Sequence, residues 1–368
     1  MVAMPECQVS VSSDQPGWRE YLDGRADATI YHDPRWGQIM RQAYGNHPYY
    51  LTARRGERIV GVLQFVHQKS LLFGSHLCSL PYFDAAGVLA DDDEARQAVM
   101  GAAAKLREET GAGFAELRSL GPPGGEALAA VRPKEKGTGT ISNNEIEPVP
   151  LRTDKITMWL SLPVGEEAMW KQLKTGVRTK VRKAQKNELP QQQGGAELLD
   201  EYCAVYVRAM RDLGSPPHSK RFFRLILDAF GPAVRVFLVR HEGRAIAASF
   251  TLTDARAFHV PWSGSDVRFR NLSANRLMYW SMLAAAAEGS SPTFDFGRST
   301  RGSGTHEFKA EWGAQEVPLH WQYLMPPGRE MPDLRPDSPK YRLMVACWKK
   351  LPVPAARFLG PRLIGKLS

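Results

Sequence analysis

The chain has 368 residues, a length typical of two domains that each bury their own core. Its hydrophobic content of 43% and charged content of 24% exclude a disordered or fibrous protein. Forty-eight Lys and Arg against 39 Asp and Glu give a net charge of +9, which favours an anionic partner such as a nucleotide, a phosphorylated lipid, RNA or an anionic membrane.

The cysteines and the N-terminus indicate the compartment. The four cysteines lie far apart and form no C-x-x-C pair, so the sequence predicts neither a zinc site nor a disulfide framework. The first residues show no basic segment followed by an apolar one, and the apolar run 277–287 is too short to span a bilayer. These features predict a cytoplasmic protein.

Two similar segments occur about half the chain apart. Residues 50–63 align without a gap on residues 237–250, at a spacing of 187 residues, and both read as β-hairpins with a glycine, Gly56 or Gly243, in the turn. Helical sequence precedes each hairpin, at 34–44 and in pieces over 197–230. The pattern predicts two copies of one α/β domain, with a chance similarity between hairpins as the alternative.

The segments after the hairpins support the duplication. Residues 91–110 predict a helix, because an acidic start suits the positive end of the helix dipole and Gly111 suits the C-terminus. Residues 273–288 and 293–296 are the corresponding helix and strand of the second half. A connection rich in Pro, Gly and Thr covers 121–150, so the predicted domains are 1–135 and 136–330, followed by a basic tail, 331–368.

A basic helix is predicted over 166–187, with Gly176 as the point at which it would break. One face is apolar and is expected in the core: Met169, Trp170, Leu173, Val177, Val181 and Ala184. An adjoining stripe carries Lys171, Lys174, Arg178, Arg182 and Lys186. Basic residues three or four positions apart would grip a diphosphate or a nucleic-acid backbone, although a solvated basic face is the alternative.

The most informative stretch is 294–314, in which an apolar strand enters a glycine-rich loop and then reaches a lysine between two aromatic residues. Its four glycines let the backbone approach a ligand closely. Arg298, Arg301 and Lys309 add positive charge, so the stretch can hold an anion or a developing oxyanion. A tight surface loop closed by an amphipathic segment is the alternative.

The chain carries three motifs in order: H-D-P-R-W-G at 32–37, R-T-K-V-R-K-A at 178–184, and F-D-F-G at 294–297 with F-K-A-E-W-G at 308–313. Together they resemble the Fem-type peptidyltransferases, a family built from two tandem domains of the GCN5-related N-acetyltransferase (GNAT) fold. The resemblance covers about residues 30 to 325. Within the family the chain is most similar to the branch that accompanies exosortase and PEP-CTERM exopolysaccharide loci.

The resemblance implies an α/β fold of two GNAT-like domains with mixed sheets flanked by helices. It implies transfer of an aminoacyl group from charged tRNA to an amine on a lipid-linked or nucleotide-linked envelope precursor, such as an exopolysaccharide precursor. By the same resemblance Arg182 contacts the acceptor phosphates, and Lys309 lies near the reacting carbonyl, where its charge can stabilise an oxyanion. Further candidate substrate-binding residues are Arg178, Lys174, Lys186 and Arg298, and the candidate bases are Asp295, Glu307 and Glu311.

Two departures from the family leave the acyl donor open. The long helical hairpin of staphylococcal-type members, a candidate tRNA-binding arm, is missing after Lys186. Coenzyme A-dependent relatives carry a glycine-bearing Q/R-x-x-G-x-G/A turn for pyrophosphate, and the corresponding residues 268–274 contain arginines but no glycine. We therefore expect no tightly bound cofactor and either aminoacyl-tRNA or acyl-CoA as co-substrate; the alternatives are an acyl-CoA-dependent N-acyltransferase and a non-catalytic protein that binds anionic glycolipid or RNA.

Two short motifs carry no functional prediction. Asp295-Phe296-Gly297 matches the magnesium motif of protein kinases, but no H-R-D loop and no G-x-G-x-x-G loop accompany it. His306-Glu307 lacks the second histidine of a zinc-binding helix. The sequence therefore predicts no metal site.

The C-terminal tail has its own charge pattern. From 338 to 368 there is no Asp or Glu, and the basic residues are Lys340, Arg342, Lys349, Lys350, Arg357, Arg362 and Lys366. Interleaved apolar residues would give an interfacial helix its membrane-facing side, which predicts peripheral contact with the inner face of the cytoplasmic membrane. The alternative is a tail that packs on the domain or is disordered, because Pro352, Pro354 and Pro361 interrupt any long helix.

Overall fold

The computed structural model describes residues 6–70, 74–120, 151–152, 154–329 and 339–366. The chain divides into two compact units. Unit 1 comprises Met1–Gly37, His47–Ile156 and Val317–Asp333, and unit 2 comprises Gln38–Asn46, Thr157–Glu316 and Leu334–Ser368. The predicted domain boundary between residues 135 and 136 lies outside the described residues.

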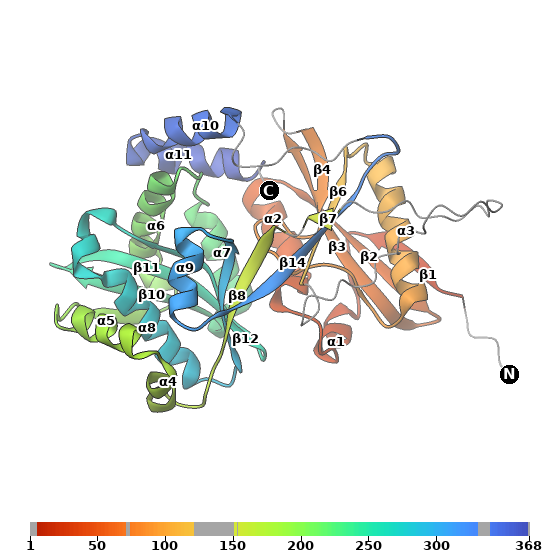
Figure 1. The fold of residues 1–368 in the computed structure, drawn as a ribbon. Helices are drawn as coiled ribbons and strands as arrows, with labels where there is room; N and C mark the ends of the chain where they lie inside the picture. The colour runs from red at the N-terminus through yellow and green to blue at the C-terminus, as the bar shows by residue number, and fades with distance from the viewer. Residues whose placement is uncertain (1–5, 71–73, 121–150, 153, 330–338, 367–368) are drawn as a thin grey trace, which may run out of the picture. The chain divides into compact units, whose positions relative to one another are not determined.

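Unit 1 contains a sheet in which β4 and β6 are parallel and the other paired strands are antiparallel (Figure 1). Its strands are β1 (Gln8–Ser12), β2 (His47–Arg55), β3 (Arg58–Ser70), β4 (Gly74–Cys78), β5 (Leu89–Ala90), β6 (Ala115–Leu120), β7 (Leu151–Arg152) and β14 (Gln315–Leu324). The strand order is β1-β2-β3-β4-β6-β14, with β5 beside β3 and β7 beside β14. Its helices are α1 (Trp18–Asp23), the 3-10 turn η1 (Ile30–His32) and α3 (Asp93–Glu109); α2 (Arg35–Tyr44) runs from unit 1 into unit 2.

The sheet of unit 1 buries side chains on both faces, because successive residues of a strand point to opposite sides. Leu51 and Leu63 pack with Val99 of α3 on one face. Tyr50 and Val62, their neighbours in the strands, pack with residues such as Trp18 on the other face. The hairpin β2–β3 is therefore the centre of the core of unit 1.

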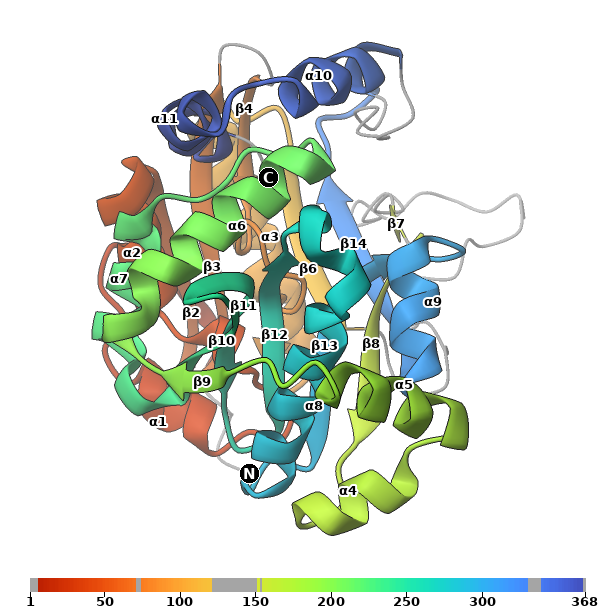
Figure 2. The same ribbon diagram turned by 90° about the vertical axis from the view of Figure 1, so that its left-hand side faces the viewer.

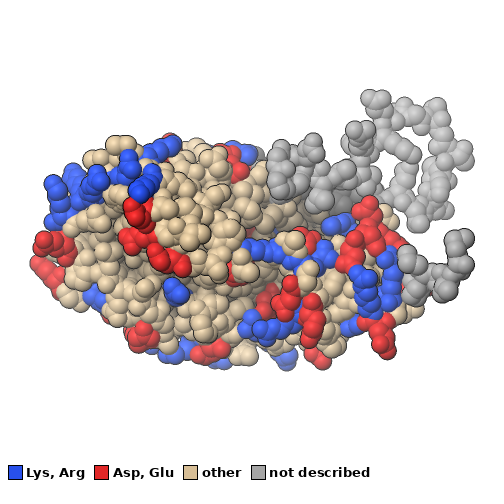
Figure 3. Space-filling model, turned by 90° about the horizontal axis from the view of Figure 1, so that it is seen from below, with Lys and Arg blue, Asp and Glu red and all other residues tan. Residues whose placement is uncertain are grey.

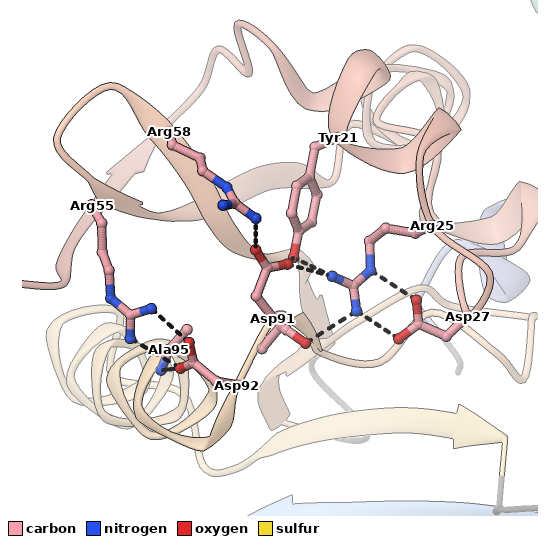
Figure 4. Close-up of polar contacts among 9 residues, drawn as sticks. Tyr21, Arg25, Asp27, Arg55, Arg58, Asp91, Asp92 and Ala95 are labelled. Carbon is pink, nitrogen blue, oxygen red and sulfur yellow. Dashed lines mark hydrogen bonds and ion pairs between the residues drawn. The ribbon is translucent and has the colours of Figure 1, made fainter. Parts of the chain in front are cut away.

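A cluster of ion pairs holds the N-terminus of α3 (Figure 4). Asp92 is the N-cap, because its carboxylate accepts a hydrogen bond from the backbone N–H of Ala95, and Arg55 pairs with the same carboxylate at 2.6 Å. Arg25 and Arg58 pair with the adjacent Asp91 at 2.7 and 2.9 Å. The acidic start predicted for this helix is confirmed, and it also binds the β2–β3 turn.

Unit 2 repeats the same plan with its own strands and a larger set of helices (Figure 2). Its strands are β8 (Lys155–Ser161), β9 (Gln191–Gly194), β10 (Val234–His241), β11 (Arg244–Thr253), β12 (Ala257–Ser265) and β13 (Thr293–Thr300), in the order β8-β13-β12-β11-β10-β9. Its helices are α4 (Glu166–Gln172), α5 (Thr175–Gln185), α6 (Leu199–Leu213), α7 (Lys220–Phe230), α8 (Ala274–Ala287), α9 (Gly304–Glu311), α10 (Pro339–Lys349) and α11 (Val353–Ile364). Short 3-10 turns are η2 (Ala196–Leu198), η3 (Gly231–Ala233) and η4 (Val267–Leu272).

Aromatic rings fill the core of unit 2 between the sheet and the helices α6 and α7. Tyr202 and Phe223 contact Phe250 of β11 with ring centroids 5.5 and 5.0 Å apart, and Phe223 contacts Trp262 of β12 at 5.2 Å. His218 joins this cluster, and burial lowers its pKa to about 3. On the sheet, α8 packs against β10, β11 and β12. The core therefore fixes β11 and β12, the strands beside the candidate site.

Both predicted hairpins are confirmed, but their alignment is shifted by one residue. The turn in unit 1 links Arg55 to Arg58, and the turn in unit 2 links His241 to Arg244, which corresponds to a spacing of 186 residues rather than 187. The gap-free alignment superposed Gly56 on Gly243. In the structure Gly56 is the first residue of its turn, whereas Gly243 is the second, although both have positive φ, +60° and +74°.

The helices predicted over 34–44, 91–110 and 273–288 are confirmed as α2, α3 and α8. The single helix predicted over 166–187 is wrong. Leu173 and Lys174 have extended backbone angles, with ψ of 138° and 143°, so α4 ends and α5 begins there. Gly176 lies inside α5 and does not break it. Leu173, at the break, is buried, and both helices keep their apolar faces toward the core.

Candidate functional site

The parallel strands β12 and β13 pair over only three positions and then separate. The last pair joins His259 to Asp295, although β12 continues to Ser265 and β13 to Thr300. Within the described residues the two strands form no further pairs with each other. We call the region beyond the last pair the strand divergence, formed by residues 260–265 and 296–300. Backbone groups at such unpaired edges are available to a ligand.

Gly297 occupies the start of the strand divergence, and only glycine fits there. Its φ is +76°, a left-handed conformation that side chains rarely adopt. A Cβ at this position would lie 3.0 Å from the carbonyl oxygen of Val260 on β12. The N–H of Gly297 donates to the Asp295 carboxylate at 2.9 Å. Beyond Val260 and Gly297, the backbones are no longer held together by strand pairing.

A buried histidine between two carboxylates lies at the last strand pair. His259 Nδ1 contacts Asp295 at 3.1 Å, and Nε2 contacts Asp254 at 3.2 Å. Burial alone would lower the pKa of His259, but hydrogen bonds to the two carboxylates and their negative charge raise it to about 9. Burial likewise opposes ionisation of Asp254, yet its contacts with His259 and with backbone N–H groups lower its pKa to about 2. His259 is therefore a buried imidazolium at neutral pH.

Asp295, one of the three candidate bases, is part of this buried network. Its carboxylate accepts hydrogen bonds from Thr157 of β8 at 2.6 Å and from Gly297, in addition to the contact with His259. Burial would raise its pKa, but these partners hold the pKa below the ordinary value. The structure thus places Asp295 where it ties β8, β12 and β13 together, and its oxygens are committed to protein partners.

Lys309, the predicted catalytic residue, lies beside the same bend of β13. It belongs to α9, whose N-cap Ser303 accepts a hydrogen bond from the N–H of His306. The side chain is 7% exposed, and its ammonium donates to the carbonyl oxygens of Gly297 and Arg298, each at 2.8 Å. Lys309 therefore places a buried positive charge against the backbone of the strand divergence.

The other predicted residues of this stretch lie nearby in different environments. Glu311 pairs with Lys180 of α5 and Arg276 of α8, both at 2.9 Å, and these contacts lower its pKa. Glu307 is exposed in the first turn of α9 and forms no ion pair within the described residues. The side chain of Arg298 is exposed on β13. Glu307 is thus the one candidate base without a charged partner in the described part of the chain.

The basic residues of α4 and α5 form a shorter row than the sequence predicts. Lys171 lies on α4, before the helix break, and pairs with Glu167. The remaining four, Lys174, Arg178, Arg182 and Lys186, are spaced four residues apart along α5 and its two caps, and we call them the α5 basic row. Lys and Arg side chains gather on this part of the surface, where α4 and α5 lie (Figure 3).

Arg182 lies over an aromatic pair. Its guanidinium carbon is 5.3 Å from the centroid of the Trp170 ring, which meets Trp280 of α8 edge to face at 4.8 Å. The two tryptophans line a hollow of about 460 Å³ together with Glu166, Glu167 and Gln185. Lys180, which contacts Glu311 of α9, is two residues from Arg182 and so points about 200° away around the helix. No contact within the described residues brings Arg182 and Lys309 together.

The N-terminus of α8 follows the C-terminal end of β12, on the side where the strands separate. Ser273 precedes the helix with φ of +56°, and no side chain caps the helix N-terminus. Ser273 thus has a left-handed conformation, in which glycine is favoured. Arg270, in the preceding turn, is exposed, whereas Arg268 is held by Asp266. A helix N-terminus that no side chain caps, beside an arginine, suits phosphate.

Unit 1 has the equivalent parallel pair, and its own chain fills the divergence. β4 and β6 pair at two positions, ending at Cys78 and Glu116. The following loop then bonds to β6: the N–H of Ser79 donates to the carbonyl of Glu116, and the N–H of Ala86 donates to that of Arg118. The buried guanidinium of Arg118 pairs with Glu116 at 2.8 Å and stacks on Trp321. The edge that is unpaired in unit 2 is thus hydrogen-bonded to a loop in unit 1.

Several residues of the site carried no signal in the sequence. His259, Asp254 and Thr157 belong to no motif, and the network forms only because three strands from distant parts of the chain come together.

Within the described residues no group of three or more His, Cys, Asp or Glu side chains is arranged to hold a metal ion. None of the described helices combines the length and apolar character that crossing a bilayer requires.

Comparison with known proteins supports an acyltransferase fold in unit 2. Residues 171–310 match the family model described as an acetyltransferase (GNAT) domain, a span that includes α5, the strand divergence and Lys309. The comparison with curated proteins gives no match.

Solved structures resemble nearly the whole chain. FemX shares 15% identity, with a TM-score of 0.64 over 91% of this chain and all of that one. The C-terminal domain of a putative lysylphosphatidylglycerol synthetase from Agrobacterium fabrum shares 11% identity, with a TM-score of 0.52 over 79% of this chain and 88% of that one. A tandem GNAT protein of the clavulanic acid pathway shares 10% identity, with a TM-score of 0.50 over 87% of this chain and 99% of that one. The chain therefore has the α/β fold of two tandem GNAT-like domains, and the matching acetyltransferase domain lies in unit 2.

Proposed function

We propose that unit 2 transfers an acyl or aminoacyl group from a phosphate-bearing donor to an amine, forming an amide on a phosphorylated cell-envelope or polysaccharide precursor. The observation that carries the proposal is the strand divergence beyond His259 and Asp295, because it opens beside a helix N-terminus within the segment that matches an acetyltransferase domain. In unit 1 the equivalent edge is covered by its own loop, so we place the reaction in unit 2.

The strand divergence suits an extended donor arm that carries phosphate. Unpaired edges can hydrogen-bond an extended chain as a neighbouring strand would. The N-terminus of α8 and Arg270 lie at the same end, where they can bind phosphate groups. Both donors carry phosphate: in a coenzyme A thioester the extended pantetheine arm joins the acyl group to a pyrophosphate, and in charged tRNA the acyl group is on the ribose of the terminal nucleotide. The similar tandem GNAT protein of the clavulanic acid pathway is described in a form without acetyl-CoA, which implies acetyl-CoA as its ligand and supports the first donor.

The reaction forms a C–N bond. It breaks the bond from the acyl carbon to the thiol sulfur of coenzyme A or to the ribose oxygen of tRNA. The amine nitrogen attacks the acyl carbonyl, negative charge develops on the carbonyl oxygen, and the leaving group takes the departing electron pair. We assign the electrostatic role to the buried charge of Lys309 at the strand divergence. We assign the proton acceptor to Glu307, because Asp295 and Glu311 are held by protein partners.

The α5 basic row is the proposed acceptor-binding surface. Arg182, over Trp170, can bind a phosphate beside the hollow of about 460 Å³, whose tryptophans can contact a sugar ring and whose Glu166 and Glu167 carboxylates can accept hydrogen bonds from sugar hydroxyls. The name of the similar putative lysylphosphatidylglycerol synthetase describes a product in which lysine is attached to a phosphorylated lipid. The similarity to its C-terminal domain supports a phosphorylated acceptor. The resemblance of the sequence to the exosortase-associated branch supports an exopolysaccharide precursor in particular.

A donor titration tests the proposal. Calorimetric titration with acetyl-CoA and with a longer acyl-CoA should show saturable micromolar binding if the donor is a coenzyme A thioester. Arg270→Gln should then weaken binding about tenfold, equivalent to about 1.4 kcal/mol. The matched control is Arg224→Gln, an exposed arginine on α7. If no acyl-CoA binds, transfer from charged tRNA that is abolished by ribonuclease would identify the other donor; absence of both results would refute the proposal.

The acceptor surface is tested separately. Arg182→Ala should weaken binding of a phosphorylated sugar precursor by at least about 1 kcal/mol, the scale of one charge-assisted hydrogen bond. Lys183→Ala, the next exposed residue of α5, removes the same charge without touching Trp170 and serves as the control. Equal affinities of the Arg182→Ala variant and the unmodified protein would sink this assignment.

A further inference from the structure

The C-terminal helices α10 and α11 expose large apolar side chains on a folded surface. The exposed fractions are 66% for Leu343 and 39% for Met344 on α10, and 61% for Phe358, 39% for Leu359 and 37% for Leu363 on α11. These five are most of the exposed large hydrophobic residues within the described chain. A concentration of exposed apolar side chains on two consecutive helices points to an interaction surface.

Other residues of both helices are packed on unit 2. Trp348 of α10 and Ala356 of α11 are buried, and both helices contact α6. Gly360 packs so closely on Pro217 that an added Cβ would lie 2.4 Å from its ring. The side chain of Asn46 also donates to the carbonyl of Gly365 at 3.0 Å. The exposed apolar residues are therefore presented by docked helices, not left over from an unpacked tail.

The segment that carries these apolar side chains is basic. The segment from 338 to 368 has no Asp or Glu, and it carries seven Lys and Arg. Arg362 stacks on Phe358 with its guanidinium carbon 3.8 Å from the ring centroid, and both residues point away from the buried Ala356 and Gly360. Figures 1 and 2 show α10 and α11 as consecutive helices at one end of unit 2, and both contact α6. We call the exposed side of the two helices the tail face.

We propose that the tail face docks on an anionic lipid bilayer. Such a surface requires apolar side chains that enter the interface and basic side chains that meet the headgroups, and the tail face carries both. A nucleic acid would use the Lys and Arg but would give no role to Leu343, Phe358 and Leu359. The proposal concerns a surface outside the strand divergence and does not depend on the acyl-transfer reaction.

The experiment is co-sedimentation of the full chain with vesicles of phosphatidylcholine alone and with about 30% phosphatidylglycerol, at about 0.15 M and 0.5 M salt. We expect binding only to the anionic vesicles and weaker binding at high salt. Leu343→Ser/Phe358→Ser should raise the dissociation constant at least tenfold. Lys349→Gln/Lys350→Gln/Arg357→Gln should do the same. Circular dichroism should show unchanged folding, because all of these side chains are exposed.

Matched variants elsewhere separate the tail face from general effects. Val164→Ser removes an exposed apolar side chain far along the sequence, and Arg19→Gln/Lys105→Gln removes exposed charge from unit 1; both should bind vesicles like the unmodified chain. Insertion is tested with Phe358→Trp, whose added fluorescence should be quenched by brominated lipid tails. Binding that survives both tail-face variants, or binding of RNA in preference to anionic vesicles, overturns the proposal.

Discussion

His259 illustrates how one side chain organises the candidate site. Its imidazolium is buried between Asp254 and Asp295, and Asp295 also accepts from Thr157 and Gly297. Replacing one member of a buried charged group leaves the others without compensation, which costs about 3–5 kcal/mol. The network therefore holds β8, β12 and β13 at the point where the strands separate.

The charge on His259 predicts how stability depends on pH. Its pKa rises from 6.5 in the unfolded chain to about 9 in the folded protein, so the stabilisation is complete below 6.5 and is lost as the pH rises through about 9. Urea unfolding at pH 6, 8 and 9.5 should show this loss. His259→Gln should be less stable by about 3–5 kcal/mol at pH 6, and its stability should change less between pH 6 and 9.5. An equal pH dependence in both proteins would show that His259 is not charged.

At acid pH, Asp254 should make stability depend on pH with the opposite sign to His259. The pKa of Asp254 falls from 3.8 to about 2, so its contribution is present above 3.8 and is lost as the pH falls through about 2. Asp254→Asn should remove that part of the acid dependence, measured as the urea midpoint between pH 5 and 2. A variant that unfolds with the same acid profile as the unmodified chain would contradict the assignment.

Gly297 and Gly302 form a matched pair for testing the strand divergence. Both have positive φ, +76° and +73°, but an added Cβ at Gly302 meets nothing within 4 Å, whereas at Gly297 it meets the Val260 carbonyl at 3.0 Å. Gly302→Ala should cost about 1–2 kcal/mol, the penalty of a left-handed alanine. Gly297→Ala should cost about 1–3 kcal/mol more, because the backbone of β12 must move. Equal costs by urea unfolding would show that the strands are not in close contact there.

At the scale of elements, short helices rather than one long helix present the charged residues. The break at Leu173 and Lys174 leaves Lys171 on α4, while the α5 basic row stays four residues apart. The contact of Lys180 and Arg276 with Glu311 then joins α5, α8 and α9 around the strand divergence. Helical periodicity placed the apolar face correctly, but it could not show that the backbone becomes extended for two residues.

Replacing serine by glycine should change stability in opposite directions at the N-cap and in the interior of α8. Ser273 has φ of +56°, where glycine is favoured, so Ser273→Gly should stabilise the protein by about 0.5–1 kcal/mol. Ser281 lies inside the same helix, where Ser281→Gly should destabilise it by about 0.5–1 kcal/mol. Thermal unfolding of the two variants measures both effects. A loss of stability in Ser273→Gly comparable to that in Ser281→Gly would contradict the left-handed geometry.

At the scale of the whole molecule, two units with the same strand order differ at the edge beyond their parallel strand pair. In unit 1 the loop after β4 bonds to β6, and Arg118 fills the space beside Glu116. In unit 2 the corresponding edge has no such loop among the described residues, and the acid Asp295 is balanced by His259 instead. A duplicated fold has thus kept one open edge and covered the other with its own chain.

This difference predicts one donor site per chain. Calorimetric titration with the donor that binds should give a stoichiometry near one. The Arg118→Met variant should lower stability by about 3–5 kcal/mol, because it leaves Glu116 buried and unpaired, without creating a second site. The outcome that would overturn this prediction is a stoichiometry near two, since unit 1 would then also accept a donor.

The sequence by itself determined the duplicated hairpins and the helices α2, α3 and α8, because periodicity, caps and turn residues act over short distances along the chain. The chemistry assigned to the stretch from Phe294 to Trp312 stays a prediction. The sequence could not determine the network of His259, the commitment of Asp295 and Glu311 to protein partners, or the covered edge of unit 1. Those features depend on which residues distant strands and helices bring within about 3 Å of each other, and only the tertiary structure decides that.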